Sequence, residues 1–342
     1  MMKAYSKAEW GKLRAVAVHK PGVEVLFGLI DPSSFLYEKP FNLNKAKKEH
    51  DELRRVLREE GIKVFRLKQV LRSRAKKDPN FRKKLINETN AKTEDPFLLV
   101  ELLTLKPSLS YESKNSQTYL KIELNNFLSN LYFMRDQQIT TKKGIIIGKM
   151  ATKQREKEVE IVKLFWEALG LDYIEVNKGY LEGGDFFPMG DFSLMGIGNR
   201  SSFDGAKILL EIEDEVGIVY ETRKEFFHLD TFFNVASSNL AVGVKELMKE
   251  SRVEVYYDKK LVKVTNLYDY IKEKGFNVVE VTLDEARKYA TNFLTIDDGK
   301  VVSPKNSANR KLQGIDVIEV PVENLTSGGG GIHCMTAVIQ RD

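Results

Sequence analysis

The sequence predicts an α/β protein in which one supersecondary unit recurs around a shared core. Two observations support this fold class. Four segments repeat a helix-like run, a glycine and a short apolar strand, and further strand candidates fall between the copies. A unit that cannot bury its own apolar face must pack against its copies, so four or five copies favour a closed ring. The same pattern is also the ordinary helix-to-strand connection of other α/β proteins, and that alternative stays open.

The repeated glycines fall where helices would end. Apolar residues before Gly61 and Gly170 recur at helical spacing, and Thr152 is a candidate N-cap for the second of these helices. Glycine takes a left-handed backbone conformation at low cost, which ends a helix and turns the chain into a strand. The clear copies have their glycines at Gly61, Gly170, Gly275 and Gly314, and a weaker fifth copy has Gly217.

Strands are also expected between the copies, at 15–19, 193–198, 227–235, 241–244, 292–296, 300–303 and 332–339. We expect one catalytic domain over 1–342, interrupted by a small helical insertion at 68–125. Prolines at 79, 96 and 107 divide this insertion into helical pieces.

Composition excludes several classes of protein. The 342 residues are 42% hydrophobic and 30% charged, as in ordinary globular proteins, and no stretch approaches the ~20 apolar residues that cross a bilayer. We therefore expect a cytoplasmic protein with no membrane partner. The net charge of +5 is a small difference between 54 basic and 49 acidic residues. The densest basic stretch, 68–84, lacks interleaved aromatic residues, which favours a solvated helical face over a nucleic-acid site.

The chain has one cysteine, Cys334, which excludes an intramolecular disulfide and a multi-cysteine metal site. A lone cysteine is most often buried packing. Cys334, however, follows four consecutive glycines at 328–331, which can bring backbone N–H groups close to a ligand, and it precedes an apolar segment expected to be a strand. A glycine run can also be a flexible linker. The neighbourhood favours a nucleophile.

Three other clusters contain the partners that a cysteine nucleophile needs. His228 and Asp230 lie two residues apart in the expected strand 227–235, so both side chains would share one face. Glu182 and Asp185 flank a glycine pair, and Asp136 follows an apolar run. Singly, such residues are more often turn acids or core histidines. Together they favour a site for a guanidinium, a planar cation whose five N–H donors require paired carboxylates.

These residues lie in motifs that resemble the arginine deiminases of the guanidino-group-modifying (pentein) superfamily. In chain order the motifs are VHKPG at 18–22, KEHD at 48–51, NLYFMRD at 130–136, EGGD at 182–185, GNRS at 198–201, HLDT at 228–231 and HCM at 333–335. The resemblance implies a five-bladed, pseudo-symmetric α/β propeller with a helical insertion and the active site on its axis.

The resemblance also implies roles for individual residues. Cys334 would attack the guanidinium carbon, Asp136 and Asp230 would hold the guanidinium nitrogens, and His228, oriented by Glu182, would transfer protons. Residues that match substrate-binding positions are Arg155 and Arg200 for the α-carboxylate, with Asn130, Phe133 and Asp185 around the substrate. No metal and no cofactor is expected, the expected partner is free L-arginine, and a homo-oligomer is allowed.

The chain departs from the family pattern at Met134, where threonine is usual, and at Gly329, where many bacterial members have another arginine. The insertion also looks shorter. Three alternatives stay open: an arginine dihydrolase that continues to ornithine, an amidinotransferase, and a non-catalytic arginine-binding relative. The first two share the cysteine, histidine and acidic residues, so these residues do not separate them.

Overall fold

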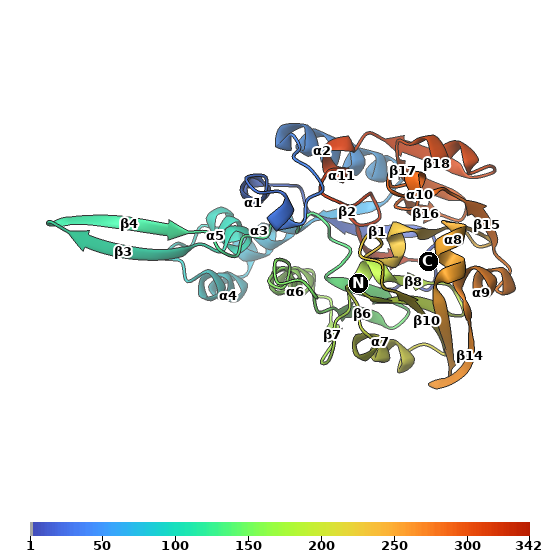
Figure 1. Ribbon diagram of the computed structural model, residues 1–342. Helices are drawn as coiled ribbons and strands as arrows, with labels where there is room; N and C mark the ends of the chain where they lie inside the picture. The colour runs from blue at the N-terminus through green and yellow to red at the C-terminus, as the bar shows by residue number, and fades with distance from the viewer. Residues whose placement is uncertain (1–2) are drawn as a thin grey trace.

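The computed structural model describes residues 3–342, and five of its sheets share one strand pattern. Each contains an antiparallel pair followed by a third strand parallel to the second (Figure 1). Three-stranded sheets are β19 (Ala337–Arg341), β1 (Leu13–Val18) and β2 (Lys63–Arg66); β5 (Gln138–Thr141), β6 (Gly144–Ile147) and β7 (Tyr173–Glu175); β11 (Phe233–Ser237), β12 (Leu240–Gly243) and β15 (Asn277–Glu280); and β16 (Leu294–Asp297), β17 (Lys300–Pro304) and β18 (Asp316–Val320). The five-stranded sheet is β8 (Phe186–Pro188), β9 (Ser193–Gly198), β10 (Glu215–Glu221), β13 (Arg252–Tyr257) and β14 (Lys260–Asn266).

Helical segments connect the parallel strands of these sheets. A parallel pair needs such a crossover because the chain must return to the starting end of the sheet. The crossovers are α2 (Leu43–Glu59) after β1, α6 (Glu158–Leu169) after β6, α7 (Phe203–Leu210) after β9, α8 (Lys245–Glu250) and α9 (Leu267–Glu273) between β12 and β15, and η4 (Ser307–Lys311) after β17. Short helices elsewhere are α1 (Val23–Gly28), α10 (Leu283–Ala286) and α11 (Glu323–Thr326), with η1 (Ser33–Phe35), η2 (Gly183–Asp185) and η3 (Leu229–Thr231).

The four clear repeat glycines have the predicted conformation. Their φ angles are +77°, +70°, +89° and +79° at Gly61, Gly170, Gly275 and Gly314, and each precedes the third strand of its sheet. The weaker copy is different. Gly217 lies inside β10, where a Cβ would approach the Tyr270 ring to 2.9 Å, so close packing and not a helix end explains this glycine.

The hydrogen bonding between strands does not by itself show the predicted closed ring of repeated units. Each sheet is hydrogen-bonded within itself, and in residues 3–342 the sheets do not join into one continuous barrel. The pairing of β1 with β19 brings the two ends of the described chain into one sheet. The α/β class is confirmed, with apolar side chains from the sheets and helices filling the core.

Two expected strands are shorter than predicted, and the difference affects the site. In 227–235, β11 begins at Phe233, and His228 precedes the 3-10 helix η3, which contains Asp230. In 332–339, β19 begins at Ala337, so Cys334 lies in a turn before the strand. Thr152 is not an N-cap, because α6 begins at Glu158 after several turns.

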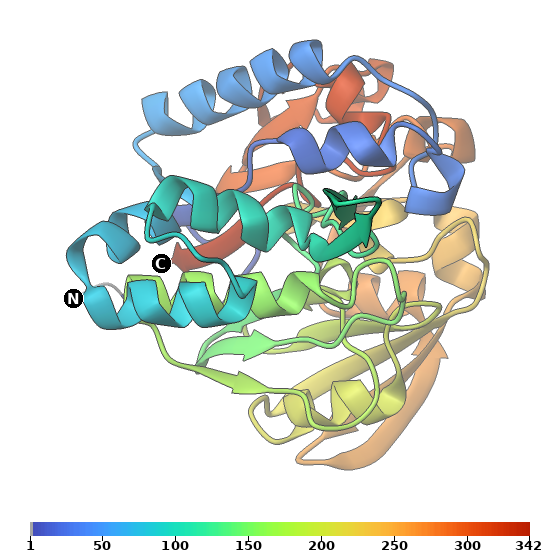
Figure 2. The same ribbon diagram turned by 90° about the vertical axis from the view of Figure 1, so that its left-hand side faces the viewer.

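The segment 68–125 is helical only in its first part. It contains α3 (Leu67–Lys77), α4 (Pro79–Thr89) and α5 (Pro96–Leu105), in which Pro79 and Pro96 occupy the first turns as expected. Figures 1 and 2 place these helices beside α6. After Pro107 the prediction is wrong: β3 (Ser108–Lys114) and β4 (Gln117–Glu123) form a hairpin that projects from the helices (Figure 1).

The helices in residues 3–342 are each too short or too polar to span a bilayer.

Candidate active site

Cys334 lies in the glycine-rich turn between α11 and β19, and its side chain is only 4% exposed. Asn292 and Asp230 contact its sulfur. The amide Nδ2 of Asn292 donates to Sγ at 3.1 Å, and Sγ lies 3.3 Å from Oδ2 of Asp230. Asn292 also accepts a bond from the backbone N–H of Cys334 at 3.1 Å. The sulfur is therefore held between an amide donor and a carboxylate.

The surroundings of the Cys334 sulfur favour its thiol form. Burial raises its pKa, and the negative charges of Asp230 and Asp136 raise it further, while the bond from Asn292 acts in the opposite direction. A cation placed between these carboxylates and the sulfur would cancel the repulsion. The geometry thus couples formation of the thiolate to arrival of a positively charged ligand.

His228 is a buried, protonated imidazole. Its Nε2 lies 2.9 Å from Glu182, and its Nδ1 lies 3.7 Å from Oδ1 of Asp136. Burial alone would lower the pKa of His228, but Asp136, Asp185 and Glu182 outweigh burial and raise it to about 9. His228 therefore carries a proton at neutral pH. The backbone of residue 184 can approach the imidazole only because this residue is glycine, since a Cβ at Gly184 would lie 2.7 Å from Nδ1 of His228.

Asp136 lies between His228 and Arg155. Its Oδ2 is paired with Nη1 of Arg155, and its Oδ1 accepts a bond from the backbone of Gly184 at 3.2 Å. Burial would raise the pKa of Asp136, but the charges of Arg155 and His228 lower it. Asp136 is thus an ionised carboxylate that faces His228, and its negative charge raises the pKa of the Cys334 thiol.

The two predicted carboxylate-binding arginines already have partners in the protein. Arg155 is bound by both Asp136 and Glu158, with Nη2 2.8 Å from Glu158. Removing one partner from such a buried pair costs about 3–5 kcal/mol, because the remaining charge is uncompensated. Arg200 is bound to Glu182 at 3.3 Å and lies over the ring of Phe227. Both arginines hold the acidic side chains of the site in place.

The other predicted substrate-binding residues surround the site at different depths. The oxygens of Asp185 accept bonds from Ser201 at 2.6 Å and from the backbone of Leu229 at 2.9 Å, and burial raises its pKa to about 7. Asn130 donates to the backbone of Phe35 at 2.8 Å. Phe133 lies against Gly330, where a Cβ would be 2.7 Å from its ring. Of these three, Phe133 lies nearest to the cysteine turn.

A cavity of about 260 Å³ opens onto Cys334. Phe227 and Thr231, which flank His228 in the chain, belong to its wall, so the cysteine turn and the histidine turn share this space. Its lining residues are Glu38, Glu225, Phe226, Phe227, Thr231, Ala286, Arg287, Tyr289, Asn292, Gly329, Gly330 and Cys334. The volume suits a small organic molecule.

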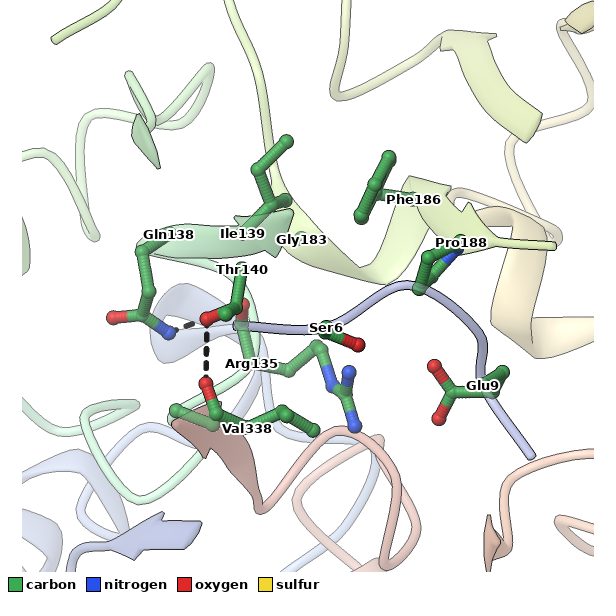
Figure 3. A pocket seen from close by; sticks show the side chains of 11 residues that line it. Ser6, Glu9, Arg135, Gln138, Ile139, Thr140, Gly183, Phe186, Pro188 and Val338 are labelled. Carbon is green, nitrogen blue, oxygen red and sulfur yellow. Dashed lines mark hydrogen bonds between the residues drawn. The ribbon is translucent and has the colours of Figure 1, made fainter. Parts of the chain in front are cut away.

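A second, interior space lies behind the site and is too small for a substrate. Its volume is about 10 Å³, enough for roughly one water molecule. Figure 3 shows Arg135 and Glu9 in this space, with the hydroxyl of Thr140 bonded to the carbonyl of Val338 at 2.6 Å. Arg135 also donates to the backbone oxygen of His333 at 3.1 Å. Arg135 therefore holds the cysteine turn in place from this side.

Asp136, Glu182 and His228 have ligand atoms within 4.8 Å of one another, a spacing that could hold a metal ion. In the structure the same atoms pair with one another and with Arg155 and Arg200. Arg155 and Arg200 already pair with one oxygen of Asp136 and of Glu182, which disfavours a metal ion coordinated by all three residues.

Sequence reasoning did not assign two residues that contact the site. Asn292 holds the cysteine, and no local motif marks it. His333 lies beside Cys334 in the HCM motif, which was a usable signal. Its Nδ1 is 2.8 Å from Asp230, and its ring stacks on Phe187 with centroids 5.3 Å apart. His333 therefore orients Asp230.

The comparisons with known proteins agree with this chemistry. A family model described as arginine deiminase matches residues 33–126 and 93–341. An arginine deiminase of Halobacterium salinarum is 26% identical over 99% of this chain and 97% of its own length. The site and the comparisons define a hydrolase that acts on C–N bonds of guanidino groups. The chain belongs to the arginine deiminase family.

Two solved structures show the same type of fold. The N-terminal domain of ArgZ, an arginine dihydrolase of cyanobacteria, is 15% identical, with a TM-score of 0.65 over 96% of this chain and 98% of that domain. AgrE in complex with ornithine and NAD+ is 16% identical, with a TM-score of 0.65 over 96% of this chain, which spans 40% of the longer AgrE chain. Both are α/β proteins of the pentein superfamily.

Proposed function

We propose that this protein is an arginine deiminase, which hydrolyses L-arginine to L-citrulline and ammonia. The observation that carries the proposal is the contact of 3.3 Å between Sγ of Cys334 and Asp230, at the wall of a substrate-sized cavity. A nucleophile beside a carboxylate suits a cationic carbon centre, because the carboxylate binds the cation and the cation lowers the pKa of the thiol.

The first half of the reaction forms a covalent adduct. Asp136 and Asp230 bind the guanidinium nitrogens, the proton of Cys334 passes to solvent, and the thiolate attacks the guanidinium carbon. His228, protonated at neutral pH, donates a proton to the departing nitrogen. The C–N bond breaks, ammonia leaves, and a thiouronium group remains on the sulfur.

The second half releases the product. Water attacks the thiouronium carbon while the now neutral His228 accepts a proton from it. The C–S bond then breaks, the electron pair and the remaining hydroxyl proton pass to sulfur, and the ureido group of citrulline is formed. These steps use only side chains of this chain and water.

We further propose that the five similar sheets are blades of a pseudo-symmetric propeller. The support is their common strand pattern, with an antiparallel pair, a crossover and a parallel third strand in each. In that arrangement, the turns that contain Cys334, His228 and Asp136 would meet near the axis.

An arginine dihydrolase is the second candidate, favoured by the likeness to the ArgZ domain. It would release a second ammonia, carbon dioxide and ornithine, because water attacks the ureido carbon again. An amidinotransferase would require an amine acceptor in place of water. A binding-only relative would have no use for a cysteine held beside the cavity.

A product assay tests these alternatives. We expect the wild-type protein to convert arginine to equimolar citrulline and ammonia, and Cys334→Ala to lose turnover while it still binds arginine in calorimetry. Mass spectrometry of acid-quenched enzyme should detect the adduct on Cys334. Ornithine without citrulline, or undiminished turnover by the alanine variant, would reject the proposal.

A further inference from the structure

A series of buried charged side chains extends behind the nucleophile, away from the cavity. Asp230, which contacts Sγ of Cys334, has its Oδ2 2.8 Å from Nδ1 of His333. On the opposite edge of this imidazole, Nε2 lies 3.6 Å from Oε1 of Glu9, and the same oxygen accepts a bond from Nη2 of Arg341 at 2.8 Å. The four side chains behind the cysteine are each at most 1% exposed. The series joins the nucleophile to the first segment and the last strand of the described chain.

Glu9 has a fixed place in this series. Its backbone N–H donates to the oxygen of Pro188 at 2.7 Å. Its partner Arg341 is held in turn, because Nη1 donates to the backbone oxygens of Gly11 at 3.0 Å and Thr295 at 2.7 Å. The carboxylate of Glu9 is therefore bound by a guanidinium that the backbone itself positions.

Glu9 is negatively charged although it is buried. Burial alone would raise its pKa, but Arg341, His333 and Arg135 outweigh burial and lower it to about 2. Figure 3 shows Glu9 and Arg135 in the interior space behind the site. Glu9 does not belong to the lining of the cavity at Cys334, so any effect on a substrate must pass through its neighbours.

The imidazole of His333 connects Glu9 to Asp230. Its ring plane is set by stacking on Phe187, with an angle of 6° between the rings. Rotation within that plane is restricted by the two carboxylates on opposite edges of the ring. Oδ1 of Asp230 has no hydrogen-bond partner in residues 3–342, so the bond at Oδ2 determines how this carboxylate faces the sulfur.

We propose that Glu9 is a positioning residue for the reaction. Held by Arg341, it fixes the imidazole of His333. His333 in turn fixes the carboxylate of Asp230 beside Sγ of Cys334. The inference rests on the proposed function, in which Asp230 aligns the guanidinium with the sulfur.

Substitution of Glu9 tests the proposal. Glu9→Gln removes the charge and keeps the shape of the side chain. We expect kcat for arginine to fall roughly tenfold to a hundredfold, because small misplacements of reacting groups are costly, while KM changes by less than about threefold. Glu9→Asp keeps the charge but withdraws it by one methylene group, so kcat should fall by less. It provides the same test if Glu9→Gln does not fold.

Glu24 offers a matched control elsewhere in the protein. Its side chain is also fully buried, with Oε1 2.8 Å from Nε2 of His19 and Oε2 3.0 Å from Nζ of Lys68. Burial would raise its pKa, but His19 and Lys68 lower it to about 2. Glu24→Gln therefore removes the same kind of buried charge from a similar group. It should lower the midpoint of urea unfolding about as much as Glu9→Gln does, but leave kcat unchanged.

The route through His333 has its own tests. In His333→Asn the amide can occupy the position of Nδ1 and donate to Asp230, but nothing replaces the Nε2 that faces Glu9. In this background Glu9→Gln should have no further effect on kcat. The chain has four histidines, so the Nδ1 proton of His333 can be assigned in NMR spectra of protein with 15N-labelled histidine by its loss in His333→Asn. Its signal should shift in Glu9→Gln and stay in place in Glu24→Gln.

The outcomes separate this inference from the proposed function. Wild-type protein that does not process arginine would overturn both. Wild-type protein that forms citrulline, with a Glu9 variant whose kcat and Nδ1 signal are unchanged, would overturn the inference alone. Equal losses of kcat in Glu9→Gln and Glu24→Gln would also overturn it, because they would indicate a general loss of stability. Additive effects of Glu9→Gln and His333→Asn would do the same, because Glu9 would then act by another route.

Discussion

Asn292 contacts Cys334 with both ends of its amide group. Nδ2 donates to the sulfur at 3.1 Å, while Oδ1 accepts the backbone N–H of the cysteine at 3.1 Å. The donor stabilises negative charge on sulfur and so opposes the carboxylates that raise the pKa of the thiol. Asn292 is therefore a positioning residue that also tunes reactivity.

The reactivity of Cys334 tests this role. Asn292→Asp keeps the acceptor but replaces the donor with a negative charge, so the pKa of Cys334 should rise further. Because the thiolate is the reacting form, alkylation by iodoacetamide at pH 8 should slow by roughly tenfold for each unit of pKa. Asn292→Ala, which loses the donor without adding charge, should slow it less. Equal alkylation rates in the two variants would contradict the electrostatic explanation.

At the scale of elements, the β3–β4 hairpin is separate from the site. Strand β4 is exposed along its whole length, and the hairpin projects away from the sheets (Figure 1). The two ends of the segment that contains the hairpin lie close together, because the backbone N–H of Leu128 donates to the backbone oxygen of Thr104 at 2.8 Å. A two-stranded hairpin alone is marginally stable in water.

Replacing residues 107–125 with a short glycine-serine linker should therefore preserve the protein. We expect the free energy of unfolding to change by less than about 1 kcal/mol, because little buried surface is lost. Steady-state turnover of arginine should also be unchanged. Urea denaturation measures the first quantity.

A substitution in the adjoining helices provides the control. Leu71 of α3 is fully buried, so Leu71→Ala should cost about 2–5 kcal/mol. If the hairpin deletion destabilises the protein as much as Leu71→Ala does, the hairpin is an integral part of the core.

At the scale of the whole molecule, the buried charges of the site couple stability to pH. Folding raises the pKa of His228 from 6.5 to about 9, because the surrounding carboxylates favour the protonated ring. The folded state therefore binds this proton more tightly than the unfolded state does. The resulting stabilisation is fully present below pH 6.5 and is lost as the pH rises through about 9.

Denaturation at several pH values measures this coupling. Between pH 6 and pH 10, the wild-type protein should lose about 3 kcal/mol of stability relative to His228→Gln, which lacks the titrating ring. Asp185 titrates near pH 7 and affects the lower part of the range, so the comparison of the two proteins above pH 7.5 is the cleaner one. Parallel curves for the two proteins would contradict the raised pKa.

The sequence by itself determined the local features of this protein. Left-handed glycines at Gly61, Gly170, Gly275 and Gly314 and the prolines that begin α4 and α5 were readable because turn and cap preferences depend on a few neighbouring residues. The chemistry-bearing residues were readable for a different reason: a cysteine after a glycine run, a histidine and several acids form motifs of a known family.

Only the tertiary structure decided which of these groups meet. The contact of Asn292 with Cys334 joins residues 42 positions apart. Arg155, predicted to bind the substrate, pairs with Asp136 of the protein itself. His228 and Asp230 reach the site from a 3-10 turn and not from a strand, because packing of the site overrides local β preference. Such contacts depend on how distant segments pack, and no local pattern in the chain encodes them.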